Sequence, residues 1–215
     1  MIEAYISPEM RGVFGAVAGA GGDMTKVNGD SIFPVLNMLN AKYFILPLQD
    51  GQTVPVQNPY VYGNAWFVDQ VHYVDNANAE LDMVGTLNLR HEAVADNRFS
   101  SVVGQSVEQD STSIVTITSY DANRLTYDVS SAKGGVIVFS EVYYPGWTAT
   151  VDGKEVHVGR VNYILRAIRV EPGNHKVELA FFPKSVDTTE TIAYAAYAVL
   201  LIVIVAMVVR RRRKK

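Results

Sequence analysis

The feature that most constrains this chain is an apolar tract near the C-terminus, residues 192–209, which contains no charge, proline or glycine. As a helix rising about 1.5 Å per residue, the tract would extend roughly 27 Å, close to the thickness of a bilayer's hydrocarbon core. Most of its residues are Ile, Leu or Val, each of which favours insertion by about 0.3 to 0.6 kcal/mol. The alternative, a buried core helix, would need a large enclosing protein that the rest of the chain cannot supply. We therefore predict one transmembrane helix.

The charges that flank the tract predict its orientation. Residues 210–215 are all Arg or Lys, whereas Asp187 and Glu190 precede the tract. By the positive-inside rule the tail stays in the cytoplasm, and the main body then lies outside it. Residues 1–30 show no basic region followed by an apolar region and a cleavage site. We therefore expect upstream membrane helices in a larger multi-span parent protein; the alternative is post-translational insertion of the anchor.

Composition excludes several classes of partner and chemistry. Without its basic tail the chain is acidic, which argues against a nucleic-acid partner, because duplex binding needs a basic face. The absence of cysteine excludes disulfides, zinc–thiolate sites and thiol nucleophiles. The glycines of residues 19–22 lack the spacing of a phosphate-binding loop, so no cofactor is expected. No metal site is expected either, because the histidines have no ligand spacing. They are His72, His91, His157 and His175.

The N-terminal half has mixed periodicity. Residues 1–30 are Gly-rich and have no sustained period, so we expect an irregular segment. Residues 31–110 are predicted to form an α+β lead-in, with a turn-rich connection at residues 47–64. The elements expected in this lead-in are helices at 32–39 and 76–84 and strands at 42–46 and 65–74.

The C-terminal half has the alternating pattern of half-buried antiparallel strands, and residues 111–184 are predicted to form a β-sandwich of the jelly-roll or Ig-like kind. Asp152-Gly153 is expected to be a hairpin turn, because both residues tolerate positive φ. A short linker, residues 185–191, would then hold the sandwich close to the lipid headgroups. The expected strands are residues 113–120, 125–130, 136–142, 147–151, 154–158, 164–170 and 175–182.

An aromatic loop between two of these strands is the densest candidate for a binding site. Aromatic rings stack on the apolar faces of sugars, and Arg, Asn and Asp offer planar hydrogen bonds to hydroxyls, so a glycan surface is our hypothesis. The alternative is that Trp147 fills the sandwich core. The candidate glycan-binding residues are Tyr143, Tyr144, Trp147, Asp152, Arg160, Asn162 and Arg166.

Two segments carry a resemblance to a known family. They are LNMLNAKYFI at residues 36–45 and YYPGWTATVDGK at residues 143–154, followed by the helix with a basic end. Together they resemble the C-terminal part of bacterial YfhO-type membrane proteins. The resemblance implies a polytopic protein of the bacterial cytoplasmic membrane, similar to lipid-linked sugar transferases of the GT-C type that decorate cell-envelope polymers. In such transferases the catalytic acidic residue lies in an early extracytoplasmic loop, so no catalytic residue is assigned to this chain.

The sequence therefore predicts a mainly β protein: an α+β lead-in, an antiparallel sandwich, one transmembrane helix at residues 192–209 and a basic cytoplasmic tail at 210–215. Its expected role is an extracytoplasmic domain accessory to cell-envelope glycosylation that contacts a glycan or lipid-linked sugar. The expected partners are the lipid bilayer and the upstream helices of the parent protein. Two alternatives stay open, namely a purely structural assembly module and a membrane-anchored hydrolase. The hydrolase would require a pocket with converging catalytic groups.

Overall fold

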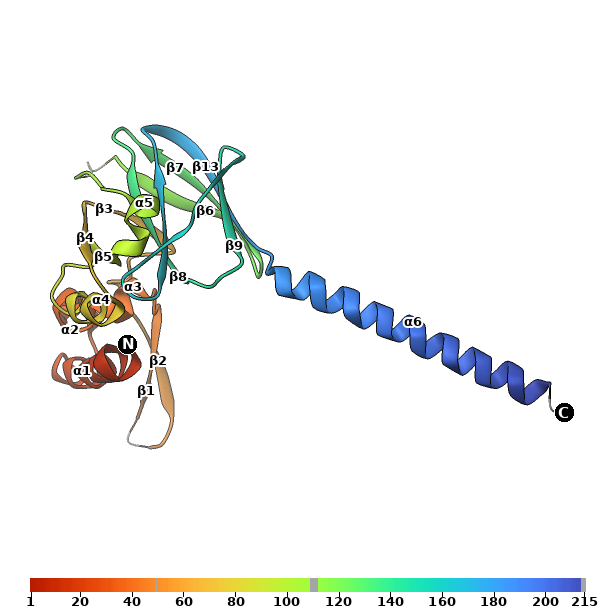
Figure 1. The fold of residues 1–215 in the computed structure, drawn as a ribbon. Coiled ribbons are helices and arrows are strands. Elements are labelled where there is room, and N and C mark those ends of the chain that lie inside the picture. The colour runs from red at the N-terminus through yellow and green to blue at the C-terminus, as the bar shows by residue number, and fades with distance from the viewer. Residues whose placement is uncertain (49, 109–111, 214–215) are drawn as a thin grey trace.

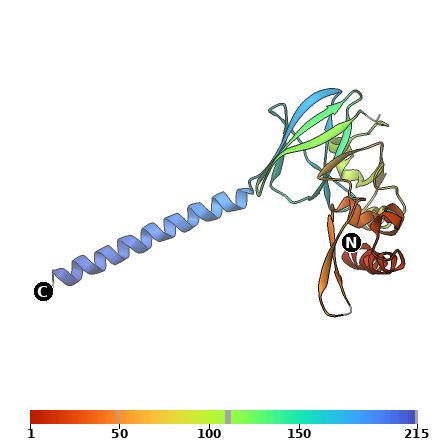
Figure 2. The ribbon, with the colours of Figure 1, turned by 180° about the vertical axis from the view of Figure 1, so that it is seen from behind.

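The structure, a computed structural model, describes residues 1–48, 50–108 and 112–213, apart from the side chains of residues 184–187. An N-terminal region of short helices and strands packs against a β-sandwich, and one long helix leaves the sandwich and projects away from everything else (Figures 1 and 2). The predicted fold class, mainly β with an α+β lead-in and one C-terminal apolar helix, is confirmed.

The sandwich consists of two antiparallel sheets. The five-stranded sheet has the order β10 (Lys154–Val156), β9 (Trp147–Val151), β13 (Gly173–Phe181), β7 (Arg124–Ser131) and β6 (Ile114–Asp121). The four-stranded sheet has the order β11 (Gly159–Val161), β12 (Leu165–Val170), β8 (Gly135–Val142) and β3 (Ala65–Val68). The core between the two sheets is formed by the side chains on their inward faces. It includes Tyr127, Phe139, Ile168, Val177 and Leu179.

The four-stranded sheet is buried on both faces. In β8, Ile137 and Phe139 point into the sandwich core, whereas Val136 and Val138 point into a second core shared with the lead-in. This arrangement explains why the strand is a continuous apolar run instead of an alternating one. The sheet is thus a wall between two cores.

The lead-in forms the layer on the other side of that wall. Its helical elements are a π-helix (Ile2–Ile6), α1 (Ser7–Gly19), a 3-10 turn (Met24–Lys26), α2 (Gly29–Ile32), α3 (Pro34–Met38), α4 (Ala77–Val84), a 3-10 turn (Asn97–Phe99) and α5 (Ser100–Val103). Its strands are the antiparallel pair β1 (Tyr43–Pro47) and β2 (Thr53–Gln57), and the parallel pair β4 (Gln70–Val74) and β5 (Glu92–Asp96). A third core, which includes Val13, Phe33 and Phe44, joins α1 to α3 and to the β1–β2 hairpin.

Several sequence predictions for the lead-in need correction. Residues 1–30 are not irregular, because α1 occupies much of them; the buried face of α1 consists of Glu9, Val13 and Val17. The carboxylate of Glu9 accepts the backbone N–H groups of Val35 (3.0 Å) and Leu36 (2.8 Å), which fixes α1 against the start of α3. A buried carboxylate that satisfies helix N–H groups is a tertiary contact, so no local period reveals it.

Three other elements differ from their expected bounds. The predicted helix at residues 32–39 is interrupted at Phe33, because Pro34 disfavours the helical conformation in the residue before it. The predicted strand at residues 65–74 is two strands, since the chain changes sheets at Asp69. The connection at residues 47–64 contains β2, and the sequence analysis missed β2, β5 and β11.

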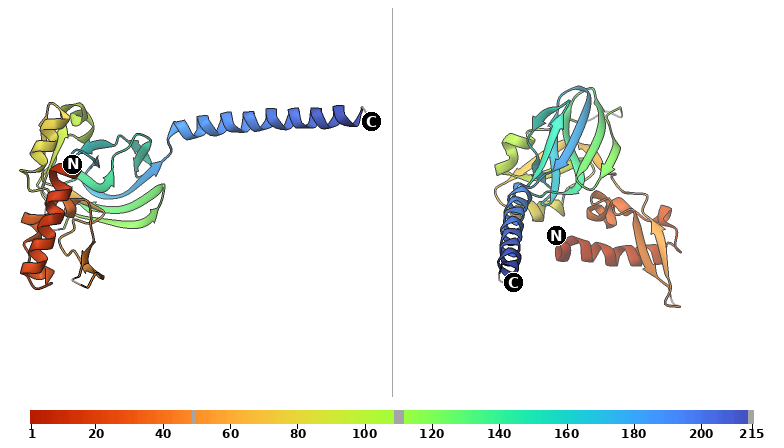
Figure 3. Two further views of the ribbon diagram at one scale, coloured as in Figure 1. Left: turned by 90° about the horizontal axis from the view of Figure 1, so that it is seen from below. Right: turned by 90° about the vertical axis from the view of Figure 1, so that its right-hand side faces the viewer.

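The last helix, α6, spans Lys184–Arg212, so the expected linker at residues 185–191 is helical. Its segment Thr188–Arg212 is long and apolar enough to cross a membrane, and none of that segment's most apolar stretch is buried within the protein. Figure 3 shows the helix leaving the end of the sandwich as an isolated rod. An exposed helix that is apolar on every side is typical of a membrane span and not of a soluble core.

Candidate functional site

The aromatic loop, residues 143–146 between β8 and β9, lies against the base of α6. The backbone N–H of Phe182 donates to the carbonyl of Gly146 (3.0 Å). Gly146 has φ of 109°, and a Cβ there would stand 3.0 Å from Cα of Pro183. Glycine is required by both the backbone conformation and the close approach. The loop and the start of the membrane helix therefore form one unit.

Trp147 is half-buried and its ring is already in contact on more than one side. The guanidinium of Arg166 lies 3.9 Å from the ring centroid, and the ring of Phe181 lies 5.2 Å away. Arg166 is itself buried, at 1% exposed, and its Nη2 lies 3.2 Å from Oε2 of Glu141. Burial lowers the pKa of Arg166, although Glu141 opposes the shift. The structure thus brings Trp147 and Arg166 together as a cation–π pair.

The two tyrosines of the loop face different neighbours. The ring of Tyr143 lies 5.7 Å from that of Phe99, on the lead-in side. The ring of Tyr144 lies 6.0 Å from that of Phe181, and 61% of Tyr144 is exposed. Only Tyr144 offers a largely open aromatic surface in this loop.

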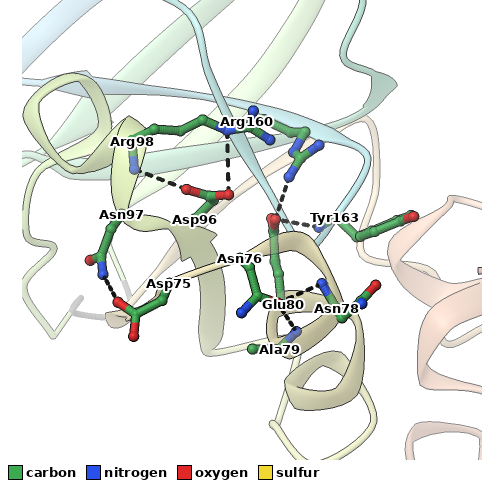
Figure 4. A network of polar contacts seen from close by, with 10 residues as sticks. All are labelled: Asp75, Asn76, Asn78, Ala79, Glu80, Asp96, Asn97, Arg98, Arg160 and Tyr163. Carbon is green, nitrogen blue, oxygen red and sulfur yellow. Dashed lines mark hydrogen bonds and ion pairs between the residues drawn. The ribbon is translucent and has the colours of Figure 1, made fainter.

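Arg160 belongs to a separate polar network, which Figure 4 shows at the junction with α4. Its Nη2 lies 2.5 Å from Oε2 of Glu80, and the backbone N–H of Tyr163 donates to Oε1 of the same carboxylate (2.9 Å). Glu80 is fully buried, and desolvation raises its pKa while the N–H of Tyr163 and the charge of Arg160 oppose the shift. Asp96 and Arg98 form a neighbouring ion pair at 3.4 Å.

Asn162 occupies a structural position beside this network. It is fully buried; its Oδ1 accepts the N–H of Val94 (2.9 Å) and its own N–H donates to the carbonyl of Val94 (2.7 Å). With φ of 50° at Asn162 and 70° at Tyr163, these residues form the tight turn between β11 and β12. Asn tolerates this left-handed conformation better than most residues. Its side chain thereby ties the sandwich to β5.

Asp152 lies at the far end of β9 from the aromatic loop. It has φ of 52° and Gly153 has φ of 76°, which matches the hairpin turn expected from the sequence. Its carboxylate lies 2.7 Å from Nδ1 of His175 and accepts the N–H of Lys176 (2.8 Å). The hydrogen bond lowers the pKa of Asp152 and raises that of His175. The seven predicted glycan-binding residues therefore do not converge, and their role in binding stays a prediction.

Sequence reasoning missed a polar groove of about 590 Å³ between the lead-in and the sandwich. Its lining residues are Leu39, Asn40, Lys42, Asn64, Ile117, Tyr120, Ser140 and Glu141. The hydroxyl of Tyr120 donates to Oε1 of Glu141 (3.1 Å), and the nearby negative charge of Glu141 raises the pKa of Tyr120. Asn40 has φ of 57°, and its buried Oδ1 has no hydrogen-bond partner among the described residues. Ser140 and Glu141, polar residues that interrupt the apolar run near the end of β8, were the signal available in the sequence.

The groove is lined in part by the first of the two segments that carry the family resemblance, and it lies close in sequence to the second. Leu39, Asn40 and Lys42 come from residues 36–45. Glu141 lies two residues before the aromatic loop, and its Oε2 pairs with Arg166, whose guanidinium stacks on Trp147. The groove also lies at the α6 end of the sandwich, because Tyr120 is opposite Leu125, which is in turn opposite Leu179 in β13. The groove offers a cation, a carboxylate, a phenol and two amides, which suits hydrogen bonding to a polyhydroxylated molecule. No cluster of three or more His, Cys, Asp or Glu side chains that could hold a metal occurs in the described part of the chain.

A β-sandwich with an α/β layer on one side and, within the described residues, one exposed apolar helix long enough to cross a bilayer is the arrangement of a membrane-anchored protein. Residues 83–193, just over half of the chain, match the family of the bacterial membrane protein YfhO, and the chain belongs to that family. The match runs from the end of α4 into α6 and includes the strands of the sandwich other than β3. No curated protein and no solved structure matches the chain.

Proposed function

We propose that this chain is the extracytoplasmic C-terminal domain of a multi-span YfhO-type protein of the bacterial cytoplasmic membrane, and that its polar groove holds a glycan during lipid-linked sugar transfer to the cell envelope. In this proposal residues 31–110 and 111–184 act as one body on the anchor, and the parent protein's upstream helices supply the catalytic residues. The observation that carries it is the position of the groove, whose hydrogen-bonding groups lie at the end of the sandwich from which the membrane helix leaves.

The orientation follows from charge. Residues 210–215, which follow the apolar tract, are all basic, and translocating such a cluster is unfavourable. The absence of cysteine makes the test direct, because any introduced cysteine is unique. Ala132→Cys, at an exposed position in the turn after β7, should react with a membrane-impermeant maleimide on intact spheroplasts. A cysteine appended after Lys215 should react only after permeabilisation, and the reverse pattern would refute the orientation.

The binding proposal is tested with variants of groove residues whose changes spare the core. We expect Lys42→Gln and Tyr120→Phe, in the full chain held in nanodiscs, each to weaken binding to cell-envelope oligosaccharides about tenfold, the effect of losing one hydrogen bond of about 1.4 kcal/mol. Lys133→Gln is the matched control, since Lys133 is exposed in the turn after β7 and lies outside the groove. No binding by the wild-type chain, or equal binding by all variants, would exclude the groove as a glycan site.

A structural assembly role is the second candidate, and the β1–β2 hairpin favours it. This two-stranded sheet extends from the lead-in (Figure 1), and Tyr43 and Ile45 on its outer face are 60% and 57% exposed. The other face of the hairpin packs in the third core, so its exposed apolar face is available to a partner. Photo-crosslinking from position 45 to other segments of the parent protein, without glycan binding, would support this role.

The groove gives no support to a hydrolase. Ser140 is the serine in the groove lining, and a serine is the usual nucleophile of a hydrolase. Its Oγ donates to the carbonyl of Gly63. An activated serine donates its hydroxyl proton to a general base, whereas Ser140 donates it to a backbone carbonyl.

A further inference from the structure

The length of α6 sets how far the sandwich stands from the bilayer. Arg210 and Glu190 are the charged residues that bound the apolar segment, and the twenty-residue rise between them is about 30 Å, the thickness of the hydrocarbon core. Only six residues, about 9 Å of helix, separate Glu190 from Lys184, where α6 begins. A bilayer with its headgroups measures about 40–45 Å, so this short segment spans little more than one headgroup layer. The end of the sandwich therefore reaches the headgroups.

Three exposed apolar side chains lie near that end of the sandwich, Val142, Tyr144 and Phe182, and together we call them the apolar patch. These residues are 58%, 61% and 63% exposed, respectively. Val142 ends β8, Tyr144 lies in the aromatic loop, and Phe182 follows β13, two residues before α6 begins. In Figure 3 the helix leaves from this end of the sandwich. The chain segments that carry the patch thus lie near the base of α6, where the N–H of Phe182 meets the carbonyl of Gly146.

The patch is held in a fixed position relative to the helix. Phe182 donates its N–H to Gly146, and the ring of Tyr144 packs against Phe181, so a shift of the loop would break contacts at the start of α6. Aromatic side chains with a polar tip favour the membrane–water interface, where the ring is desolvated and the hydroxyl stays hydrated. Exposed aromatics at this height have lipid as their natural neighbour.

We propose that the patch of Val142, Tyr144 and Phe182 inserts into the lipid headgroup layer and docks the sandwich on the membrane surface as a second contact beside α6. With this second contact, the sandwich cannot change its orientation relative to the membrane by pivoting at the base of α6. Glu141, which directly precedes Val142, lines the polar groove, so docking sets the groove at a fixed height just above the headgroups.

The test uses nitroxide labels on single cysteines in the full chain, reconstituted in phosphatidylcholine–phosphatidylglycerol liposomes. Labels at Tyr144→Cys and Phe182→Cys should collide with a water-soluble nickel complex several-fold less than a label at Ala132→Cys. Ala132 is exposed at the opposite end of β7 and serves as the matched control. Circular dichroism of each variant shows that the sandwich is folded.

Equal aqueous access at all three positions would overturn the proposal. A second measurement separates lipid from a second copy of the chain, because protection by lipid persists when the protein is diluted in a large excess of lipid. Protection that disappears on dilution would mean that another copy covers the patch, and this result would also overturn lipid docking.

Discussion

Glu80 provides the sharpest test of how the lead-in is held to the sandwich. Its carboxylate is fully buried, and it neutralises Arg160 while it accepts the N–H of Tyr163 at the β11–β12 turn. Glu80→Gln preserves the shape of the side chain but leaves the largely buried guanidinium, whose side chain is 17% exposed, without a counter-charge. Removing one partner of a buried ion pair costs about 3–5 kcal/mol.

For a domain of this size each kcal/mol lowers Tm by about 2–4 °C, so we expect Glu80→Gln to melt roughly 6–20 °C below the wild type. The assay is thermal unfolding of the full chain in mild detergent, followed by circular dichroism of the β signal. Glu155→Gln is the control, since Glu155 is an exposed carboxylate on β10 and its loss should change stability by less than about 0.5 kcal/mol.

A double-mutant cycle completes this test. Arg160→Met removes the buried charge, so the double variant Glu80→Gln/Arg160→Met should be less destabilised than the sum of the two single variants. If Glu80→Gln had the same Tm as the wild type, or if the destabilisations of the two single variants were additive in the double variant, the ion pair would not be the contact that holds α4 to the β11–β12 turn.

Three further predictions concern other parts of the sandwich. Trp147→Ala should lower stability by about 3 kcal/mol or more because it empties a packed site, measured by chemical denaturation; a near-neutral result would mean that the ring is free for a ligand. Gly146→Ala should cost about 1–3 kcal/mol from its positive φ and its contact with Pro183, seen as a lower Tm. The pKa of His175 is raised above its ordinary 6.5 and that of Asp152 is lowered, so the stabilisation from their pair is present in mildly acidic buffer, where both groups are charged, and is lost as pH rises through the folded-state pKa of His175. His175→Gln should therefore lose stability in acidic buffer and little in alkaline buffer, and equal losses in both would contradict the assigned pairing.

The sandwich was predictable because its strands carry local signals. Leu125, Tyr127 and Val129 alternate with polar residues, and Asp152-Gly153 marks a turn that few other residue pairs allow. The signal for the apolar segment of α6 is also local. A long uncharged run that crosses lipid must satisfy its backbone hydrogen bonds within itself, and a helix does so. These are the elements for which sequence and structure agree.

The lead-in and the groove were less predictable, because long-range contacts determine them. The Ala-Val-Ala core of β5 has no alternation, and it becomes a strand by pairing with β4. Asn162 is a residue type that commonly hydrogen-bonds to glycans, yet its side-chain oxygen accepts the backbone N–H of Val94 in β5. Asn40 and Glu141 are distant in sequence and meet only when the lead-in packs on the sandwich. One sequence alone does not show which of its distant residues lie close together in the folded protein.

The double burial of β8 limits how far the groove can change its shape. One wall of the groove comes from the lead-in and the other from the sandwich, and both are anchored to a strand whose two faces are embedded in close-packed apolar side chains. Close-packed interiors transmit displacement and deform little, so the two walls cannot open or close independently. A ligand would enter a site that is already shaped, and most of the entropy lost on binding would be the ligand's own.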